Sequence, residues 1–130
     1  MGGKTKYSQK KEFGRAELVE KKKSLITRGF FKNKTNEVWM SHSDSVQVKP
    51  KGFEVIAVSK NSRFAVLENK RKKIFTTQFH PEVYHTNNGK KIFENFIFSM
   101  CKIKKKWTNK YKINELVKQI KASIPKDKKV

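Results

Sequence analysis

Short apolar runs bounded by polar or glycine-containing stretches organise the first two thirds of the chain. Phe53–Ser59 alternates and is rich in β-branched residues, which predicts a strand. Phe64–Leu67 and Ile74–Phe79 flank a charged turn, so they predict a hairpin. The other expected elements are short: strands at Lys11–Leu18 and Glu37–Met40, and a loop over Ser41–Ser45.

The spacing of apolar residues becomes helical after this strand region. From Lys90 they recur three and four positions apart, which predicts an amphipathic helix packed on a sheet, with core positions Ile92, Phe93, Phe96, Ile97, Met100 and Cys101. Asn87 or Asn88 is the expected N-cap. A second helix is expected at Ile113–Ile124, ending before Pro125, and the lysine-rich Lys126–Lys129 predicts a disordered basic tail.

Length and cysteine content restrict the class of protein. The 130 residues suggest one domain or a piece of one. No apolar run is long enough to cross a membrane, and no secretory signal is evident. The single cysteine excludes an intrachain disulfide and fits a reducing compartment, so a cytoplasmic location is predicted. The histidines lack regular ligand spacing, so neither a metal nor another cofactor is expected.

The charge is extreme, with a formal net charge of +21 and a pI near 10.2. Such a balance predicts non-specific binding to polyanions. The lysines are spread along the chain in runs at 21–23, 70–73, 102–106 and 126–129, where turns and helix ends are expected. Nucleic-acid recognition needs cations gathered on one face with a reading element. A biological nucleic-acid function is therefore the weaker interpretation of the charge.

One short motif carries candidate chemistry. His80 and Glu82 stand two positions apart at the end of an expected strand, where side chains share a face. Pro81 biases His80 toward an extended backbone. Glu82 can then orient one ring nitrogen of His80 while the other faces a nucleophile. From the spacing alone, an ordinary exposed strand end that carries both residues is the commoner explanation.

Five longer segments occur in a fixed order: MGGK (1–4), KEFGRAEL (11–18), EVWMSHSDSV (37–46), GFEVIAVS (52–59) and QFHPEVYHT (78–86). Together they resemble the second half of a class I glutamine amidotransferase domain, most closely that of the glutamine-hydrolysing GMP synthases. GRAEL, WMSHxD and QFHPEVxHT are specific only in combination. The resemblance implies an α/β, flavodoxin-like domain, of which this chain holds a part with strands and a hairpin followed by amphipathic helices.

The resemblance also implies a site. His80 and Glu82 match the family's catalytic histidine and glutamate, and the backbone of Ser41, His42, Ser43 and Asp44 would help to hold the glutamine substrate. The family has a glycine at the place of Ser43. If that backbone needs a positive φ, serine costs on the order of 1 kcal/mol or more. From the residues alone, His42 is better explained as a surface or hydrogen-bonded loop histidine and His85 as a structural one.

The family's nucleophile is a cysteine that lies shortly upstream of the GGK segment, so the chain is expected to begin just after its own nucleophile. Cys101 is expected to be a small buried core residue. The resemblance divides the chain into part of an amidotransferase domain at 1–107 and a truncated linker helix with a basic tail at 108–130. The family's ATP pyrophosphatase domain would follow there.

Three functions remain open. The first is a GMP synthase-like amidotransferase fragment, related to ammonia supply for the amination of XMP to GMP. It is predicted to be inactive without a complementing N-terminal half or ATP pyrophosphatase domain. The second is a non-catalytic binding or regulatory module, and the third is a basic nucleic-acid-binding protein. No membrane partner is expected.

Overall fold

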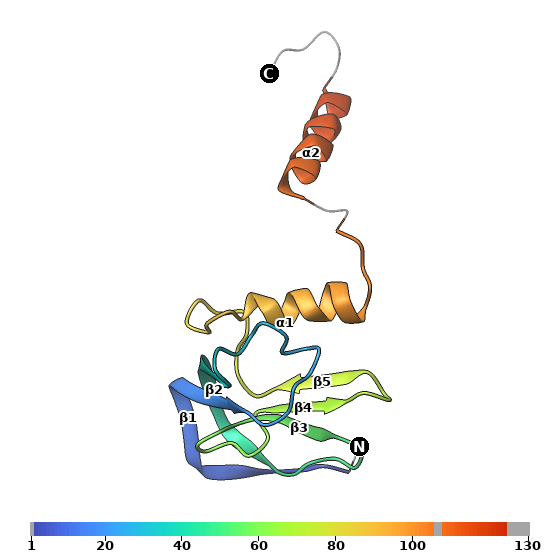
Figure 1. Ribbon diagram of the computed structural model, residues 1–130. Helices are drawn as coiled ribbons and strands as arrows, with labels where there is room; N and C mark the ends of the chain where they lie inside the picture. The colour runs from blue at the N-terminus through green and yellow to red at the C-terminus, as the bar shows by residue number, and fades with distance from the viewer. Residues whose placement is uncertain (1, 106–107, 125–130) are drawn as a thin grey trace.

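The computed structural model describes residues 2–105 and 108–124. Its centre is a five-stranded, wholly antiparallel sheet in the order β2-β1-β3-β4-β5. Figure 1 shows the long, strongly bent β1–β2 hairpin at one side of the sheet, the hairpin of β4 and β5 at the other, and a helix across one face. The strands are β1 (Lys4–Glu20), β2 (Thr35–Val48), β3 (Glu54–Ser59), β4 (Val66–Asn69) and β5 (Ile74–Thr77).

The first two strands are longer than their sequence pattern predicts. The predicted loop at Ser41–Ser45 is wrong, because these residues continue β2 and pair with β1. Their polarity suggested a loop, but the partner strand satisfies their backbone groups. The register shifts between Tyr7 and Glu12, which lie opposite Asp44 and His42. The extra residues on β1 bend the hairpin.

The strands after this hairpin follow the prediction. β3 occupies the predicted Phe53–Ser59 region, and β4 pairs with β5 across the charged turn. Val38 and Met40 of β2, Ile56 of β3 and Val66 of β4 are buried in one apolar cluster. Phe30 from the β1–β2 connection and Phe79 join it with stacked rings 5.5 Å apart. This cluster lies under the segment that carries His80.

The helix after β5 begins where its apolar spacing predicts it, as α1 (Lys90–Glu94), and then widens into a π-helical turn, η1 (Asn95–Met100). The predicted asparagine N-cap is wrong. Gly89 is the N-cap without a side-chain hydrogen bond, and Asn88 has a φ of 54°.

The prediction of Cys101 as a buried core residue is also wrong, because its side chain is exposed. The N–H of Cys101 donates to the carbonyl of Phe96, five residues back. This wider turn shifts the following side chains away from the face that α-helical spacing would give them. Within the turn, Phe96 is 43% exposed, while Asn95 is buried and donates to the carbonyls of Ile26 and Arg28. Phe93, which precedes the turn in α1, is also exposed, at 41%.

The last helix, α2 (Asn109–Ser123), contacts no other helix or strand in the described part of the chain. It begins four residues earlier than predicted because the Thr108 hydroxyl caps it by accepting a hydrogen bond from the N–H of Tyr111. Its apolar stripe of Ile113, Leu116, Val117 and Ile120 is exposed. The predicted tail at Lys126–Lys129 lies outside the described residues. No helix in the described ranges is long and apolar enough to cross a membrane.

Candidate functional site

The structure brings His80 and Glu82 together just beyond the end of β5. Nδ1 of His80 lies 2.7 Å from Oε1 of Glu82. The side chains are 43% and 56% exposed. An ionised carboxylate can only accept, so Nδ1 carries the shared proton and Nε2 is left as the free ring nitrogen. A histidine oriented in this way can exchange a proton with a reacting group.

The pKa of Glu82 is lowered from the ordinary value of 4.5, first by a hydrogen bond from its own backbone N–H and then by the hydrogen bond from His80. Both interactions favour the ionised carboxylate. Glu82 is therefore charged at neutral pH and can stabilise a protonated His80.

The backbone around His80 is fixed against β2. The N–H of His80 donates to the carbonyl of Trp39 over 3.0 Å. The buried Thr86 hydroxyl donates to the carbonyl of His80 and accepts from the N–H of Trp39. Thr86 thus connects the backbone of His80 to the backbone of Trp39 in β2. His85 stacks on Trp39 with ring centroids 4.6 Å apart, which is a structural contact of the kind predicted for it.

Gly89 fixes the same loop by close packing. A Cβ at position 89 would overlap the carbonyl oxygen of Pro81 and lie 2.9 Å from the Pro81 carbonyl carbon. Pro81 stands between His80 and Glu82, so the start of α1 approaches the centre of the candidate site. Only a residue without a side chain permits this approach.

The stretch Ser41–Asp44 lies beside the His80 segment. Met40 and Phe79 form a β-bridge, and the side-chain amide of Gln78 donates to the carbonyl of Asp44 over 3.3 Å. Left-handed φ occurs at five described non-glycine residues, and Ser43 is not among them. The cost considered for a serine at this position therefore does not arise.

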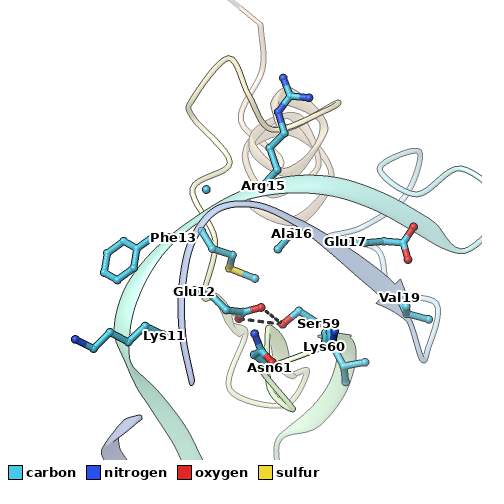
Figure 2. Close-up of a pocket in the computed structure, with 13 residues that line it drawn as sticks. Lys11, Glu12, Phe13, Arg15, Ala16, Glu17, Val19, Ser59, Lys60 and Asn61 are labelled. Carbon is cyan, nitrogen blue, oxygen red and sulfur yellow. Dashed lines mark hydrogen bonds between the residues drawn. The ribbon is translucent and has the colours of Figure 1, made fainter. Parts of the chain in front are cut away.

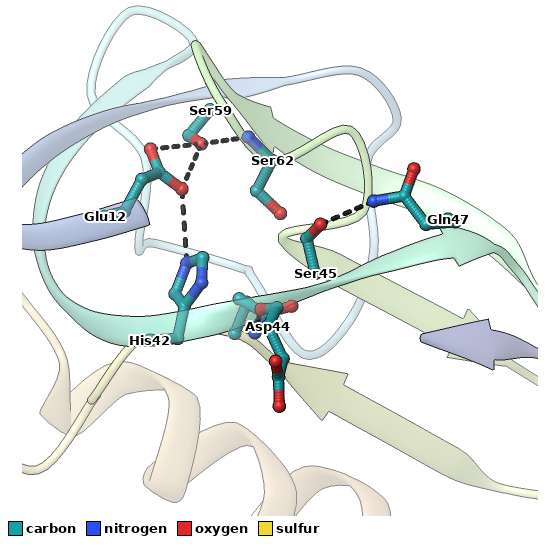
Figure 3. Close-up of polar contacts among 8 residues, drawn as sticks. Glu12, His42, Asp44, Ser45, Gln47, Ser59 and Ser62 are labelled. Atoms are coloured by element: carbon teal, nitrogen blue, oxygen red, sulfur yellow. Dashed lines mark hydrogen bonds and ion pairs between the residues drawn. The ribbon is translucent and has the colours of Figure 1, made fainter. Parts of the chain in front are cut away.

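His42 has a different environment from the one predicted. It lies in β2 rather than a loop, its side chain is 10% exposed, and Nε2 is 3.2 Å from Oε2 of the buried Glu12 directly opposite on β1. Neither ring nitrogen has a hydrogen bond of good geometry among the described residues, so the contact is electrostatic. Figure 3 shows Ser59 on the other side of Glu12, donating to Oε1 and Oε2 over 2.8 and 3.0 Å.

Glu12 and Ser59 of this cluster line an open groove of about 520 Å³ on the concave side of the bent β1 strand. Figure 2 shows the side chains of Glu12 and Ser59 meeting inside the arc of β1, next to Lys60 and Asn61, while Arg15 points away from them. The carboxylate of Glu12 is held on both sides, by Ser59 and by His42. The cluster therefore supports the β1–β2 hairpin from behind the Ser41–Asp44 stretch.

Cys101 does not belong to the His80 site. It follows the eleven-residue helix of α1 and η1, while the His80 loop precedes that helix. A helix of that length separates its two ends by about 15 Å. In the described ranges no three His, Cys, Asp or Glu side chains are grouped as metal ligands.

Thr86, Gly89 and Glu12 were not identified as site-supporting residues from the sequence. Thr86 and Glu12 stand inside the motifs QFHPEVYHT and KEFGRAEL, but a motif does not say which member is buried. Gly89 follows two asparagines, a pattern typical of an ordinary turn. Its role depends on the approach of Pro81, which only the folded chain creates.

Residues 1–100 match the family model described as "Glutamine amidotransferase class-I". The chain belongs to the class I glutamine amidotransferase family.

Within the family, its relatives include proteins named "GMP synthase [glutamine-hydrolyzing]". That of Aquifex aeolicus is 46% and that of Brachyspira hyodysenteriae 45% identical, each over 95% of this chain. The chain spans about a quarter of the length of these relatives, 24% in each case.

Among solved structures, a protein from Thermoplasma acidophilum that is described as a GMP synthase subunit is similar, with a TM-score of 0.71 and 28% identity. The match covers 90% of this chain and 53% of that one. The α/β amidotransferase fold predicted from the motifs is thereby confirmed.

Proposed function

We propose that this chain supplies the histidine–glutamate part of a glutamine-hydrolysing site, and that the ammonia released there serves the amination of XMP to GMP. The contact of 2.7 Å between His80 and Glu82 carries the proposal, because it leaves Nε2 of His80 free. The family to which the chain belongs and its likeness to GMP synthases supply the substrate.

The reaction begins with a cysteine thiolate that attacks the side-chain carbonyl carbon of glutamine. The protonated His80 gives its Nε2 proton to the leaving ammonia, and a thioester forms. His80 then removes a proton from water, whose oxygen attacks the thioester to release glutamate and regenerate the thiolate. Glu82 holds the ring in one orientation and stabilises its cation. The backbone of Ser41–Asp44 would hold the amino-acid end of the glutamine.

The thiolate must come from another segment or chain, because Cys101 is the single cysteine in this sequence and lies at the far end of the helix. We expect the complementing partner to be an N-terminal amidotransferase half, with an ATP pyrophosphatase domain as the consumer of ammonia. The 130 residues alone should not hydrolyse glutamine. The reaction would take place in the cytoplasm.

The test is ammonia release from glutamine by the purified chain, alone and mixed with the product of the adjacent upstream reading frame. Activity is expected only in the mixture. His80→Ala should abolish it, while His85→Ala, a control in the same loop, should retain most of it. Activity that survives His80→Ala, or a mixture without ammonia release, would refute the proposal.

A second candidate function is a non-catalytic binding module. The exposed apolar stripe of α2 favours it, because a helix with such a stripe is normally packed against a partner. This function predicts partner binding that does not depend on glutamine and that survives His80→Ala.

A further inference from the structure

A second cavity lies at the other end of β5 from His80, where the β4–β5 hairpin meets the end of the covering helix (Figure 1). Its volume is about 580 Å³, within the range of small-molecule sites. Apolar walls come from Leu25, Phe75, Phe96 and Met100. The exposed lysines 70, 73 and 102 also line it.

A buried carboxylate without a partner lines this cavity. Glu68 of β4 is 2% exposed, and its Oε2 has no hydrogen bond among the described residues. No ion pair between described residues includes it. A buried acceptor left in this state is costly. Because Oε2 has almost no accessible surface, a donor in the cavity would reach it only if the Glu68 side chain turned toward the cavity.

Glu54 provides a direct contrast on the same sheet. It lies opposite Glu68 in the β3–β4 register, but it is exposed and paired with Lys22 at 2.8 Å. Glu54 therefore has its partner within the chain, while Oε2 of Glu68 lacks one in the part that the structure describes.

The walls of the cavity favour a flat ligand. Phe75 on β5 is the cross-strand neighbour of Glu68. The ring of Phe96 packs edge to face against the ring of Phe75, with centroids 6.4 Å apart. Phe96 remains 43% exposed, so part of its side chain is accessible to a ligand. Nucleobases commonly stack on aromatic side chains in proteins, whatever the base. The lysines at the rim suit an anionic group on the same ligand.

We propose that this cavity binds a guanine mononucleotide. The base edge of guanine presents a ring N–H and an exocyclic amino group as neighbouring donors, which suit the acceptor-only carboxylate of Glu68. Adenine places an acceptor beside its amino group and would be repelled. The phosphate lies toward the lysines. The site is separate from His80 and does not depend on glutamine hydrolysis.

The single thiol is a built-in reporter, because Cys101 is exposed and lines the same cavity. The purified chain is titrated with GMP, AMP or guanosine while the rate of Cys101 modification by a thiol reagent is followed. Calorimetry gives the affinity. GMP should protect Cys101 saturably and bind at least about tenfold more tightly than AMP, a difference typical of one lost charged hydrogen bond.

Two variants separate the recognition of base and phosphate. Glu68→Gln should weaken GMP binding about tenfold or more, while the matched control Glu54→Gln changes it less than about twofold. Lys70→Ala should weaken GMP binding but leave guanosine binding unchanged. Urea unfolding of Glu68→Gln checks its fold, and we expect little loss of stability because glutamine has nearly the size and shape of glutamate.

The proposal is overturned if GMP and AMP protect Cys101 equally and Glu68→Gln leaves the GMP affinity unchanged. In that case the lysines would bind the phosphate group alone, without recognition of the base. It is also overturned if GMP gives no saturable protection. Neither result would affect the glutaminase test, which measures ammonia and uses His80.

Discussion

The chain contains two contacts between a histidine and a glutamate, and they differ in nearly every physical respect. His80 and Glu82 are neighbours in sequence, 2.7 Å apart and about half exposed. His42 and Glu12 come from opposite strands, lie 3.2 Å apart, and have side chains that are 10% and 6% exposed. The same two residue types therefore serve two purposes. The exposed contact can reach a substrate, whereas the buried one holds two strands together.

The surroundings explain the difference. Glu82 receives hydrogen bonds from its own N–H and from His80, and both side chains are about half exposed to solvent. Glu12 receives two contacts from Ser59 and one from His42, so the protein replaces the water that burial removed. Loss of one partner should therefore be severe in the buried cluster and mild in the exposed one.

The largest effect on stability is expected for Glu12→Ala. It leaves the buried Ser59 hydroxyl without its acceptor and removes the carboxylate beside His42. Each buried polar group that is left unsatisfied costs about 1–3 kcal/mol. Urea unfolding gives the free energy directly. Glu82→Ala is the matched control and should change the midpoint only slightly. Equal losses in the two variants would contradict the distinction between the contacts.

Gly89→Ala should have the next largest effect, because the new methyl group displaces the carbonyl of Pro81 between His80 and Glu82. Overpacking of this kind costs about 1–3 kcal/mol. Thermal unfolding measures the loss, and the NMR signals of His80 should shift. Lys90→Ala, at the next and exposed position, should do neither. A Gly89→Ala variant as stable as the parent would show that the loop adjusts freely.

Ser59→Ala should be somewhat milder. It removes the hydroxyl that donates to Glu12 and that accepts from the N–H of Ser62, which leaves buried groups unpaired at about 1–2 kcal/mol. Ser41→Ala, at an exposed position of β2, is the control and should be neutral in the same chemical denaturation experiment. If Ser41→Ala lost more unfolding free energy than Ser59→Ala, the hydroxyl of Ser59 would not be the group that stabilises the hairpin.

The smallest effect concerns pH. Because the pKa of Glu82 is lowered in the folded chain, its stabilising contribution is present above the ordinary value of 4.5 and disappears as the pH falls through the lowered value. The parent should therefore melt slightly above Glu82→Gln at pH values above 4.5. The difference should close on further acidification. Melting curves recorded through this range should show it, and a difference that grows toward acid would reverse the sign argued here.

Much of the fold followed from local sequence signals. Alternation predicted β3, the charged turn between two apolar runs predicted the β4–β5 hairpin, and helical spacing predicted where α1 begins. These elements depend on residues close together in the chain. The predicted loop at Ser41–Ser45 failed because the hydrogen bonds of that stretch come from β1, about thirty residues away along the chain.

The errors in the covering helix have a different cause. The sequence carries apolar residues at α-helical spacing up to Cys101, but residues 95–100 take a π-helical turn. In the folded chain Asn95 points inward to two carbonyls of the β1–β2 connection. A pattern based on hydrophobicity does not identify a polar residue with buried partners.

Residue identity and order were enough to reveal the family, the pair His80 and Glu82, and the single cysteine of this sequence. The folded chain was needed to show that Glu12 lies opposite His42, that Gly89 admits Pro81, and that Glu68 is buried beside a cavity. The physical reason is that burial and partnership depend on strand register and on helix packing. Strand register and helix packing both depend on residues that are far apart in the chain, so no short stretch of sequence specifies them.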